Sequence, residues 1–260
     1  GPNATRARPR PGSGASPILH ENLVVVNASA ESRSIRALDK STGEQVWRVD
    51  EIVDSWSTPL VVSRADGTSE LVVIERSHVL ALDPATGKKL WFCEKPSDYV
   101  CPSVIAHKEV VYVINSRRNA MLMALRTGGR GDVGQTHVLW KKPRWTTRVS
   151  TPVYHDGHLY AMDFLGQAHC LDAETGEEVY RQRLDVAGAG DKIYASPVAA
   201  DGKLYGVTRL DGTVVLALAP QFELLGHNRL GDESVFNATP VVSDGQLLLR
   251  SDRFLYCIGR

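Results

Sequence analysis

Histidine residues of this chain form one pattern that could bind a metal ion. His155 and His158 flank an Asp-Gly turn and could point in the same direction. However, no third or fourth ligand lies near them in the sequence, as a zinc site would need. His20 and His107 also occupy the place of His155 in two other copies of the same sequence pattern. A residue that recurs with a repeat is better explained by the architecture of that repeat, so we expect no metal site.

A glycine-rich segment could bind a nucleotide phosphate. Residues 129–134 read Gly-Arg-Gly-Asp-Val-Gly and match the G-x-G-x-x-G spacing. A dinucleotide loop needs a helix directly after it, because the helix N-terminus binds the pyrophosphate. Residues 136–140, Thr-His-Val-Leu-Trp, instead have the pattern of a strand. We therefore interpret the segment as a flexible hairpin insertion.

Cysteines and carboxylates offer little sign of catalysis. Cys170 and Cys257 occupy equivalent places in different repeats, where a small buried side chain is expected. Cys93 and Cys101 lie on consecutive predicted strands, so a disulfide between them is geometrically possible, and its redox state stays open. No G-x-S-x-G nucleophile elbow occurs, and most carboxylates fall on turns. The sequence therefore predicts no catalytic residues.

Length and charge limit the classes of function. The chain has 260 residues, of which Lys and Arg together make 30 and Asp and Glu together also make 30. This zero net charge disfavours a generic nucleic-acid binder, which would carry a basic surplus. No apolar stretch is long enough for a transmembrane helix. Residues 1–16 are basic and proline-rich and lack the apolar core of a signal peptide.

The elements that position these residues form a repeat. Six prolines follow a small residue at spacings of 42 to 50 residues. The pairs are Ser16-Pro17, Thr58-Pro59, Cys101-Pro102, Thr151-Pro152, Ser196-Pro197 and Thr239-Pro240. Each proline opens a series of short runs rich in Val, Ile, Leu and Tyr, separated by Gly and Asp, which is typical of strands and hairpins. About four antiparallel strands per unit and about six units predict an all-β fold, a β-propeller.

The predicted blades lie near residues 16–54, 55–97, 98–146, 147–191, 192–233 and 234–260, within a propeller domain at 16–260. Residues 1–15 are expected to be a flexible N-terminal segment. The last unit has only three predicted strands, and residues 1–11 resemble no strand that could complete it. An unpaired strand edge favours association. We therefore expect either an imperfectly closed ring or a longer natural chain.

A second marker follows each proline by about twenty residues. It reads Ala37-Leu-Asp39-Lys-Ser-Thr42-Gly43-Glu-Gln-Val-Trp47 and recurs at residues 81–91 and 170–180. Asp and Thr can hydrogen-bond the backbone of their own turn, and Gly accepts a positive φ. The pattern Ala-x-Asp-x-x-Thr-Gly-x-x-x-Trp resembles the tryptophan-docking repeat of the bacterial pyrroloquinoline-quinone-like (PQQ-like) β-propellers. The resemblance extends from about Ser16 to Ile258.

This resemblance implies more than one function. The first is a non-enzymatic scaffold in the periplasm or outside the cell that binds a protein or a ligand and needs no cofactor, like the β-barrel assembly lipoprotein of Gram-negative outer membranes. The second is a quinoprotein dehydrogenase that binds PQQ and calcium. Enzymes that share this resemblance are usually much longer and contain a pair of adjacent cysteines that stacks on the quinone. This sequence has no such pair. The third is a carbohydrate-binding propeller.

Residues just before each proline marker are the candidate binding residues. In a propeller, the innermost strand lines a central channel, so residues that enter this strand surround one mouth of the channel. They mix aromatic, charged and amide side chains, as interfaces and small polar-ligand sites do. The candidates are Trp56, Tyr99, Arg148, Tyr194 and Asn237. We expect them to bind a protein or a small polar ligand, although the aromatic rings could instead pack between blades.

Overall fold

The computed structural model describes residues 12–186, 192–210, 212–231 and 233–259, and nearly all its regular structure is β-strand. The predicted all-β class is therefore confirmed. The expected flexible segment at 1–15 lies mostly outside the described residues. None of the helices in the described ranges has the length and apolarity needed to cross a membrane.

The strands occur in six sheets within the described residues. The first contains β1 (Ile18–His20), β2 (Leu23–Ala28), β3 (Ser34–Asp39) and β4 (Gln45–Asp50), with helix α1 (Ser29–Ser32) between β2 and β3. The second contains β5 (Leu60–Ser63), β6 (Ser69–Ile74), β7 (His78–Leu82), β8 (Lys89–Glu94) and, paired to β8, β12 (Gly131–Asp132). The third contains β9 (Ile105–His107), β10 (Val110–Ile114), β11 (Met121–Arg126) and β13 (Val138–Pro143).

The remaining three sheets follow in chain order. The fourth contains β14 (Val153–His155), β15 (His158–Met162), β16 (Gln167–Asp172) and β17 (Glu178–Arg183). The fifth contains β18 (Val198–Ala200), β19 (Lys203–Thr208), β20 (Gly212–Ala217) and β21 (Leu224–Asn228). The sixth contains β22 (Val241–Ser243), β23 (Gln246–Arg250) and β24 (Leu255–Ile258).

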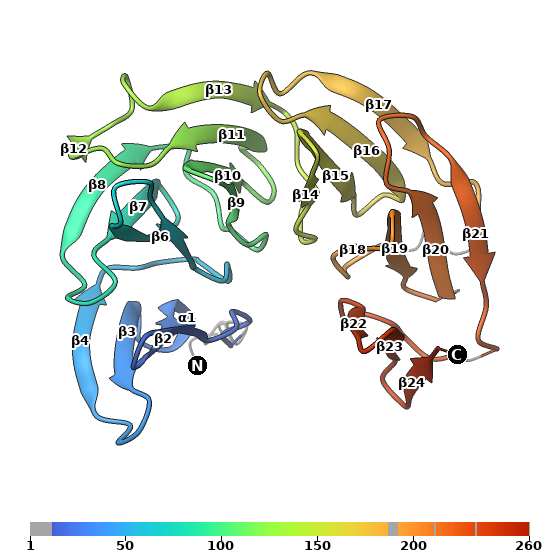
Figure 1. Cartoon of the computed structure of the whole chain (residues 1–260), viewed down its shortest axis with the longest axis horizontal. Coiled ribbons are helices and arrows are strands. Elements are labelled where there is room, and N and C mark those ends of the chain that lie inside the picture. The colour runs from blue at the N-terminus through green and yellow to red at the C-terminus, as the bar shows by residue number, and fades with distance from the viewer. Residues whose placement is uncertain (1–11, 187–191, 211, 232, 260) are drawn as a thin grey trace, which may run out of the picture.

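The sheets stand around a common centre, as Figure 1 shows. The first-named strands, such as β9, β14, β18 and β22, lie nearest this centre, and the outer strands β4, β8, β13, β17 and β21 form the periphery. The first and last sheets flank an opening in the ring, and no strand pairing joins them among the described residues. Several four-stranded antiparallel sheets are thus shown, whereas the number of blades in a complete ring stays a prediction.

Asp-Gly turns connect the inner two strands of three sheets. In the fourth sheet, Asp156 has a φ of 41° and Gly157 a φ of 75°. Positive φ at both central residues matches the right-handed twist of the two strands, and Asp and Gly tolerate this conformation better than other residues. These turns fix the register, in which His155 lies opposite His158.

The Asp-Thr-Gly marker forms the turn between the outer two strands of a sheet. Where the preceding sheet carries the marker tryptophan, its indole contacts this turn. Asp39 Oδ1 accepts hydrogen bonds from the backbone N–H groups of Ser41 and Thr42 at 2.8 and 2.9 Å. Trp47 Nε1–H donates to the Pro84 carbonyl oxygen of the next marker at 3.0 Å, and Trp140 Nε1–H donates to that of Ala173 at 3.2 Å. Each indole therefore joins its own sheet to the next, as the repeat resemblance implies.

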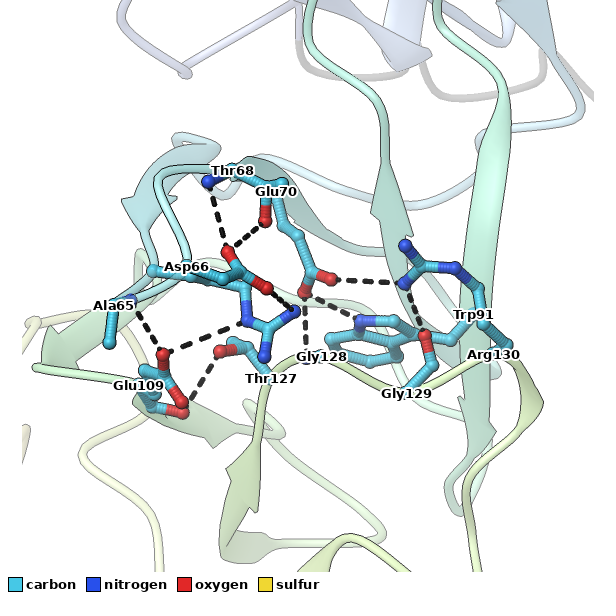
Figure 2. Close-up of polar contacts among 11 residues, drawn as sticks. Ala65, Asp66, Thr68, Glu70, Trp91, Glu109, Thr127, Gly128, Gly129 and Arg130 are labelled. Atoms are coloured by element: carbon cyan, nitrogen blue, oxygen red, sulfur yellow. Dashed lines mark hydrogen bonds and ion pairs between the residues drawn. The ribbon is translucent and has the colours of Figure 1, made fainter.

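A different arrangement buries Trp91, because the third marker contains the glycine-rich insertion. Residues 128–134, which we call the strap, are ordered, and Gly131 and Asp132 pair in parallel with β8 of the preceding sheet. Figure 2 shows the contacts beneath the strap. Trp91 Nε1–H and the backbone N–H of Gly128 both donate to Oε2 of the buried Glu70, at 2.7 and 3.1 Å.

The strap is therefore not the flexible hairpin expected from its glycines. It pairs through its backbone and covers a buried carboxylate. Gly128 is needed for close packing, because a Cβ there would lie 2.4 Å from an Arg64 nitrogen. Arg130 Nη1 lies 3.5 Å from Glu70 Oε1 and is the charged partner of this carboxylate. The strand β13 follows the strap, as the sequence of residues 136–140 predicts.

Hydroxyl side chains beside the proline markers link the sheets around the centre. The backbone N–H of each marker residue donates to the hydroxyl of the equivalent residue in the next sheet, at 2.8 to 3.2 Å. The series is Ser16, Thr58, Ser103, Thr151, Ser196 and Thr239. In the third sheet the series passes through Ser103 and not Cys101, because β9 begins two residues after Ser103. The Cys101-Pro102 pair therefore lies two residues before the position that is equivalent to the other markers.

Candidate functional site

The described connections between neighbouring sheets all lie at one end of the ring. Because the strands of a sheet alternate in direction, the turns between second and third strands emerge at the same end as these connections. We call this end the mouth surface. It comprises the connections 51–59, 95–104, 144–152, 192–197 and 233–240, and the turns 29–33, 75–77, 115–120, 163–166, 209–210 and 251–254. Backbone hydrogen bonds tie the two sets together, as from Ile193 N–H to the Phe164 carbonyl at 3.3 Å and from Phe236 N–H to that of Arg209 at 2.9 Å.

Trp56 and Tyr99 form the first aromatic group of the mouth surface. Their rings meet edge to face with centroids 6.1 Å apart, and both are half-buried. Trp56 Nε1–H donates to the backbone oxygen of Gly12 at 2.9 Å, so part of the indole is covered by the N-terminal segment. Trp56 also lines a hollow of about 160 Å³ with Arg33, Asp54 and Arg76.

Arg148 and Tyr194 belong to a second group, which also includes two residues that the sequence did not single out. The guanidinium carbon of Arg148 lies 4.8 Å from the ring centroid of Phe164. Phe164 and Tyr194 meet edge to face at 5.3 Å, and the guanidinium carbon of Arg209 lies 5.2 Å from the Tyr194 centroid. These four residues form a row that we call the Arg-aromatic row. It crosses from the fourth sheet to the fifth.

Asn237 lies apart from both aromatic groups. It is exposed and lines a shallow hollow of about 350 Å³ with Val235, Arg250 and Asp252 of the sixth sheet. Its neighbour Phe236 is 2% exposed and packs on Ala195, Val207 and Leu249, so that ring belongs to the core. The structure thus gathers the five predicted residues on one end but not in one pocket, and their role in binding stays a prediction.

Several carboxylates of the mouth surface are turned inward. Asp98, which is 8% exposed, accepts hydrogen bonds from the backbone N–H groups of Tyr99, Arg117 and Asn119. Asp163, which is 6% exposed, accepts from the backbone of Leu165 and Gln167 and lies 3.2 Å from His169 Nε2. Burial acts to raise the pKa of Asp163, but the hydrogen bonds from His169 and the backbone outweigh it and hold that pKa below its usual value. These acids therefore stabilise turns instead of facing solvent.

Arginine recurs in the turns between second and third strands. Five sheets carry one there, and the series is Arg33, Arg76, Arg117, Arg209 and Arg253. Arg76 pairs with Asp54 at 3.2 Å, but the other four have no carboxylate partner among the described residues. The recurrence of arginine at this place was visible in the sequence and could have identified Arg209. Phe164 could not be found in this way, because it replaces the arginine of the fourth sheet.

The residues present do not fit a bound quinone. The four cysteines are free and dispersed: Cys93 and Cys170 are buried in different sheets, Cys101 is half-buried in a connection, and Cys257 is exposed. No pair of adjacent cysteines is available to stack on a quinone ring. In the described ranges, no three His, Cys, Asp or Glu side chains come close enough together to hold a cation. We therefore derive no reaction step through PQQ and calcium.

Comparison with known proteins adds a family and several structural neighbours. A family model described as outer membrane protein assembly factor BamB matches residues 5–137 and 131–221. The protein of that name from Escherichia coli is 28% identical over 192 residues, which are 69% of this chain and 44% of that protein. The one from Kangiella koreensis is 25% identical over 210 residues, 75% of this chain and 48% of that protein. The chain thus spans about half the length of these relatives.

Solved structures agree on the fold. The crystal structure of BamB from Moraxella catarrhalis superposes with a TM-score of 0.67 at 16% identity, covering 95% of this chain and 73% of that one. A quinohemoprotein alcohol dehydrogenase from Comamonas testosteroni superposes with a TM-score of 0.62 at 15% identity, covering 85% of this chain and 43% of that one. At these identities the likeness concerns the fold alone.

Proposed function

The chain belongs to the family of PQQ-like propellers described as outer membrane protein assembly factor BamB, and from this premise we propose that it is a non-enzymatic scaffold that binds a partner protein at its mouth surface. The name of the relatives supports a partner within the machinery that assembles outer membrane proteins. It also supports a location at the periplasmic face of the outer membrane.

The observation that carries this proposal is that recurring and non-recurring residues lie in different parts of the fold. Residues that recur from sheet to sheet are used for architecture. The hydroxyl series joins the sheets around the centre, and the contacts of Trp47 with Gly87 and of Trp140 with Gly176 join two pairs of sheets near the periphery. Residues that do not recur, such as Trp56, Tyr99 and Phe164, lie at one end and are partly exposed. A rigid disc with variable loops at one end suits protein recognition.

Co-purification tests the proposal. The chain, exported to the periplasm of a Gram-negative bacterium, is purified from the solubilised envelope, and the recovered proteins are identified by mass spectrometry. We expect known components of the outer membrane assembly machinery with the wild type and their loss with the double variant Trp56→Ala, Arg148→Ala. The matched control Lys40→Ala, Lys203→Ala changes one turn residue and the first residue of β19, both at the opposite end, and should retain these components. Equal recovery with both double variants would reject the mouth surface as the binding site.

Two alternatives are decided by independent assays. For a quinoprotein dehydrogenase, the purified chain is mixed with PQQ and Ca²⁺, and dye reduction with alcohols or glucose is followed; stoichiometric quinone binding with turnover would overturn the non-enzymatic proposal. For a carbohydrate-binding propeller, a glycan array is probed with the wild type and with the Trp56→Ala, Arg148→Ala variant. Glycan binding that this variant loses would replace the protein partner by a carbohydrate.

A further inference from the structure

We propose that the Arg-aromatic row binds an acidic segment of a partner protein. This inference rests on the proposed function and specifies the chemistry of the partner at one part of the mouth surface. It assigns a role to Phe164, which stands where other sheets carry an arginine, and to Arg209, one of the arginines that recur in these turns.

The geometry of the row pre-arranges two guanidinium groups. Arg148 lies over Phe164 at 4.8 Å and Arg209 over Tyr194 at 5.2 Å, so each guanidinium is stabilised by the electron-rich face of a ring. The two rings support each other edge to face at 5.3 Å. A guanidinium that rests on a ring still has its N–H edge free to bind a carboxylate through two parallel hydrogen bonds. Because the rings hold the arginines in place, less side-chain entropy is lost on binding.

The described residues supply no carboxylate that neutralises the positive charge of this region. Neither Arg148 nor Arg209 has a carboxylate partner among the described residues, and the exposed Arg144 and Lys192 in the same connections also lack one. The carboxylate beside Phe164, Asp163, is buried and bonded to His169 and to the backbone. The whole chain has no net charge. The basic character is therefore local, which suits an acidic segment of limited length better than a nucleic acid.

Apolar side chains beside the row favour a peptide over a free anion. Leu165 is 53% exposed and follows Phe164, and Leu210 is 45% exposed and follows Arg209. Each arginine-aromatic contact is thus flanked by an exposed leucine. A segment that alternates carboxylates with an apolar residue would bury these leucines while its carboxylates pair with the guanidinium groups.

Fluorescence anisotropy with a defined probe tests this inference. The probe is a short fluorescein-labelled peptide rich in glutamate with one central leucine, and its control has glutamine in place of every glutamate. We expect the full chain to bind the glutamate peptide at low salt and to lose affinity as salt is added, because exposed charges are screened. The double variant Arg148→Gln, Arg209→Gln should bind at least about tenfold more weakly, as expected for the loss of two charge-assisted contacts.

Matched variants separate the row from general charge and from folding. Arg183→Gln removes one exposed arginine from the outer strand β17 and should leave the affinity unchanged. Phe164→Leu keeps both arginines but removes the ring beneath Arg148, so it should also weaken binding. Thermal unfolding of each variant is measured to check that its fold is kept. Equal binding of the glutamate and glutamine peptides, or unchanged affinity of the double arginine variant, would overturn the inference.

Two further outcomes distinguish this inference from the proposed function. Binding to phosphatidylglycerol vesicles without binding to the peptide would replace the acidic segment by an anionic membrane and overturn the inference. In the second outcome, the assembly components still co-purify with the Arg148→Gln, Arg209→Gln variant but not with the Trp56→Ala, Arg148→Ala variant. The protein-binding scaffold then stands, and the acidic-segment inference fails. If the peptide binds the row but no assembly component co-purifies, the acidic site stands and the proposed partner class fails.

Discussion

Gly87 lies directly beneath the indole ring of Trp47 from the preceding sheet. A Cβ atom on Gly87 would be 2.8 Å from Trp47 Cε3, and Gly176 has the same relationship to Trp140 at 2.7 Å. Both glycines have a positive φ, 73° and 74°. The equivalent Gly43 of the first sheet has a φ of 75°, but nothing lies within 4 Å of its Cβ position, because no described sheet precedes it. The three turns therefore share a backbone and differ in the contact above it.

Alanine at these glycines separates backbone strain from tryptophan docking. Gly43→Ala should lower the free energy of unfolding by about 1–2 kcal/mol, the cost of a left-handed conformation for alanine. Gly87→Ala should lower it by about 2 kcal/mol more, because Trp47 must move and its hydrogen bond to the Pro84 carbonyl is lost. Urea denaturation of the two variants measures the difference. Equal destabilisation would show that the indole contact contributes little to stability.

Glu70 should be the polar residue whose loss is felt most beneath the strap. It is 1% exposed and accepts hydrogen bonds from Trp91 Nε1–H and Gly128 N–H. Glu70→Ala leaves both donors buried without a partner, so we expect a loss of about 2–4 kcal/mol in the free energy of unfolding. Glu70→Gln keeps an acceptor of the same shape and should cost less. Thermal or urea unfolding provides the comparison.

Arg130→Gln is the control for the charge above Glu70. The Arg130 side chain is 64% exposed, and its nitrogen lies 3.5 Å from Glu70 Oε1. Exposed pairs contribute little because solvent screens them, so a loss below about 1 kcal/mol is expected. A larger loss with Arg130→Gln than with Glu70→Ala would show that the ion pair, and not the two buried N–H donors, holds the strap.

Lys95 should make the stability of the fold depend on alkaline pH. Burial lowers the pKa of Lys95 to about 8, although Glu75 and Asp98 act to raise it. An unfolded lysine keeps its proton up to about pH 10.4. Between these values the unfolded state holds more protons, so the free energy of unfolding should rise with pH, by at most about 3 kcal/mol.

Lys95→Met removes the titrating group and serves as the comparison. Lys95 Nζ donates to the Arg76 carbonyl at 2.9 Å, so the variant also loses one hydrogen bond at every pH. The difference between the two unfolding free energies should nevertheless change across the window from about pH 8 to 10.4, because only the wild type has a titrating group at position 95 and all other groups are common to both proteins. A difference that stays constant with pH would contradict the buried, weakly basic lysine.

The cysteines should react as four independent thiols. Burial raises the pKa of Cys93 and Cys101 and raises that of Cys170 to about 11, which lowers the fraction of reactive thiolate. Cys257 is exposed. With Ellman's reagent, we expect one fast thiol in the native chain, absent in Cys257→Ser, and four after unfolding without reductant. Two thiols after unfolding would indicate a disulfide between Cys93 and Cys101.

The repeat made the fold predictable from sequence, because the same residue types recur at the same strand and turn positions of each unit. The contact of Trp47 with the next marker follows from the resemblance of its motif. The Cys101-Pro102 marker misled the alignment, since a small residue before proline imitates the hydroxyl that Ser103 supplies two residues later. The strap was misinterpreted because glycine indicates flexibility in isolation, whereas here Glu70 lies beneath it and β8 pairs with it.

The site was less predictable than the fold. Trp56, Tyr99, Arg148 and Tyr194 were chosen for their place beside the markers, and the structure places them at one end of the ring. Phe164 was not found, because its importance depends on contacts with two residues that lie 16 and 30 positions away in the sequence. Which connection faces which turn is decided by the sheet-to-sheet packing, and a single sequence does not display it.

Photo-crosslinking tests the central claim, that the mouth surface is the protein-binding end, most directly. Benzoylphenylalanine is placed at Trp56, Tyr99 or Asn237 on the mouth surface and at Lys40, Glu174 or Lys203 at the opposite end, and the exported chain is irradiated in living Gram-negative cells. We predict adducts with an outer membrane assembly component from the mouth positions and none from the opposite end. Adducts with that component only from Lys40, Glu174 or Lys203 would contradict the claim.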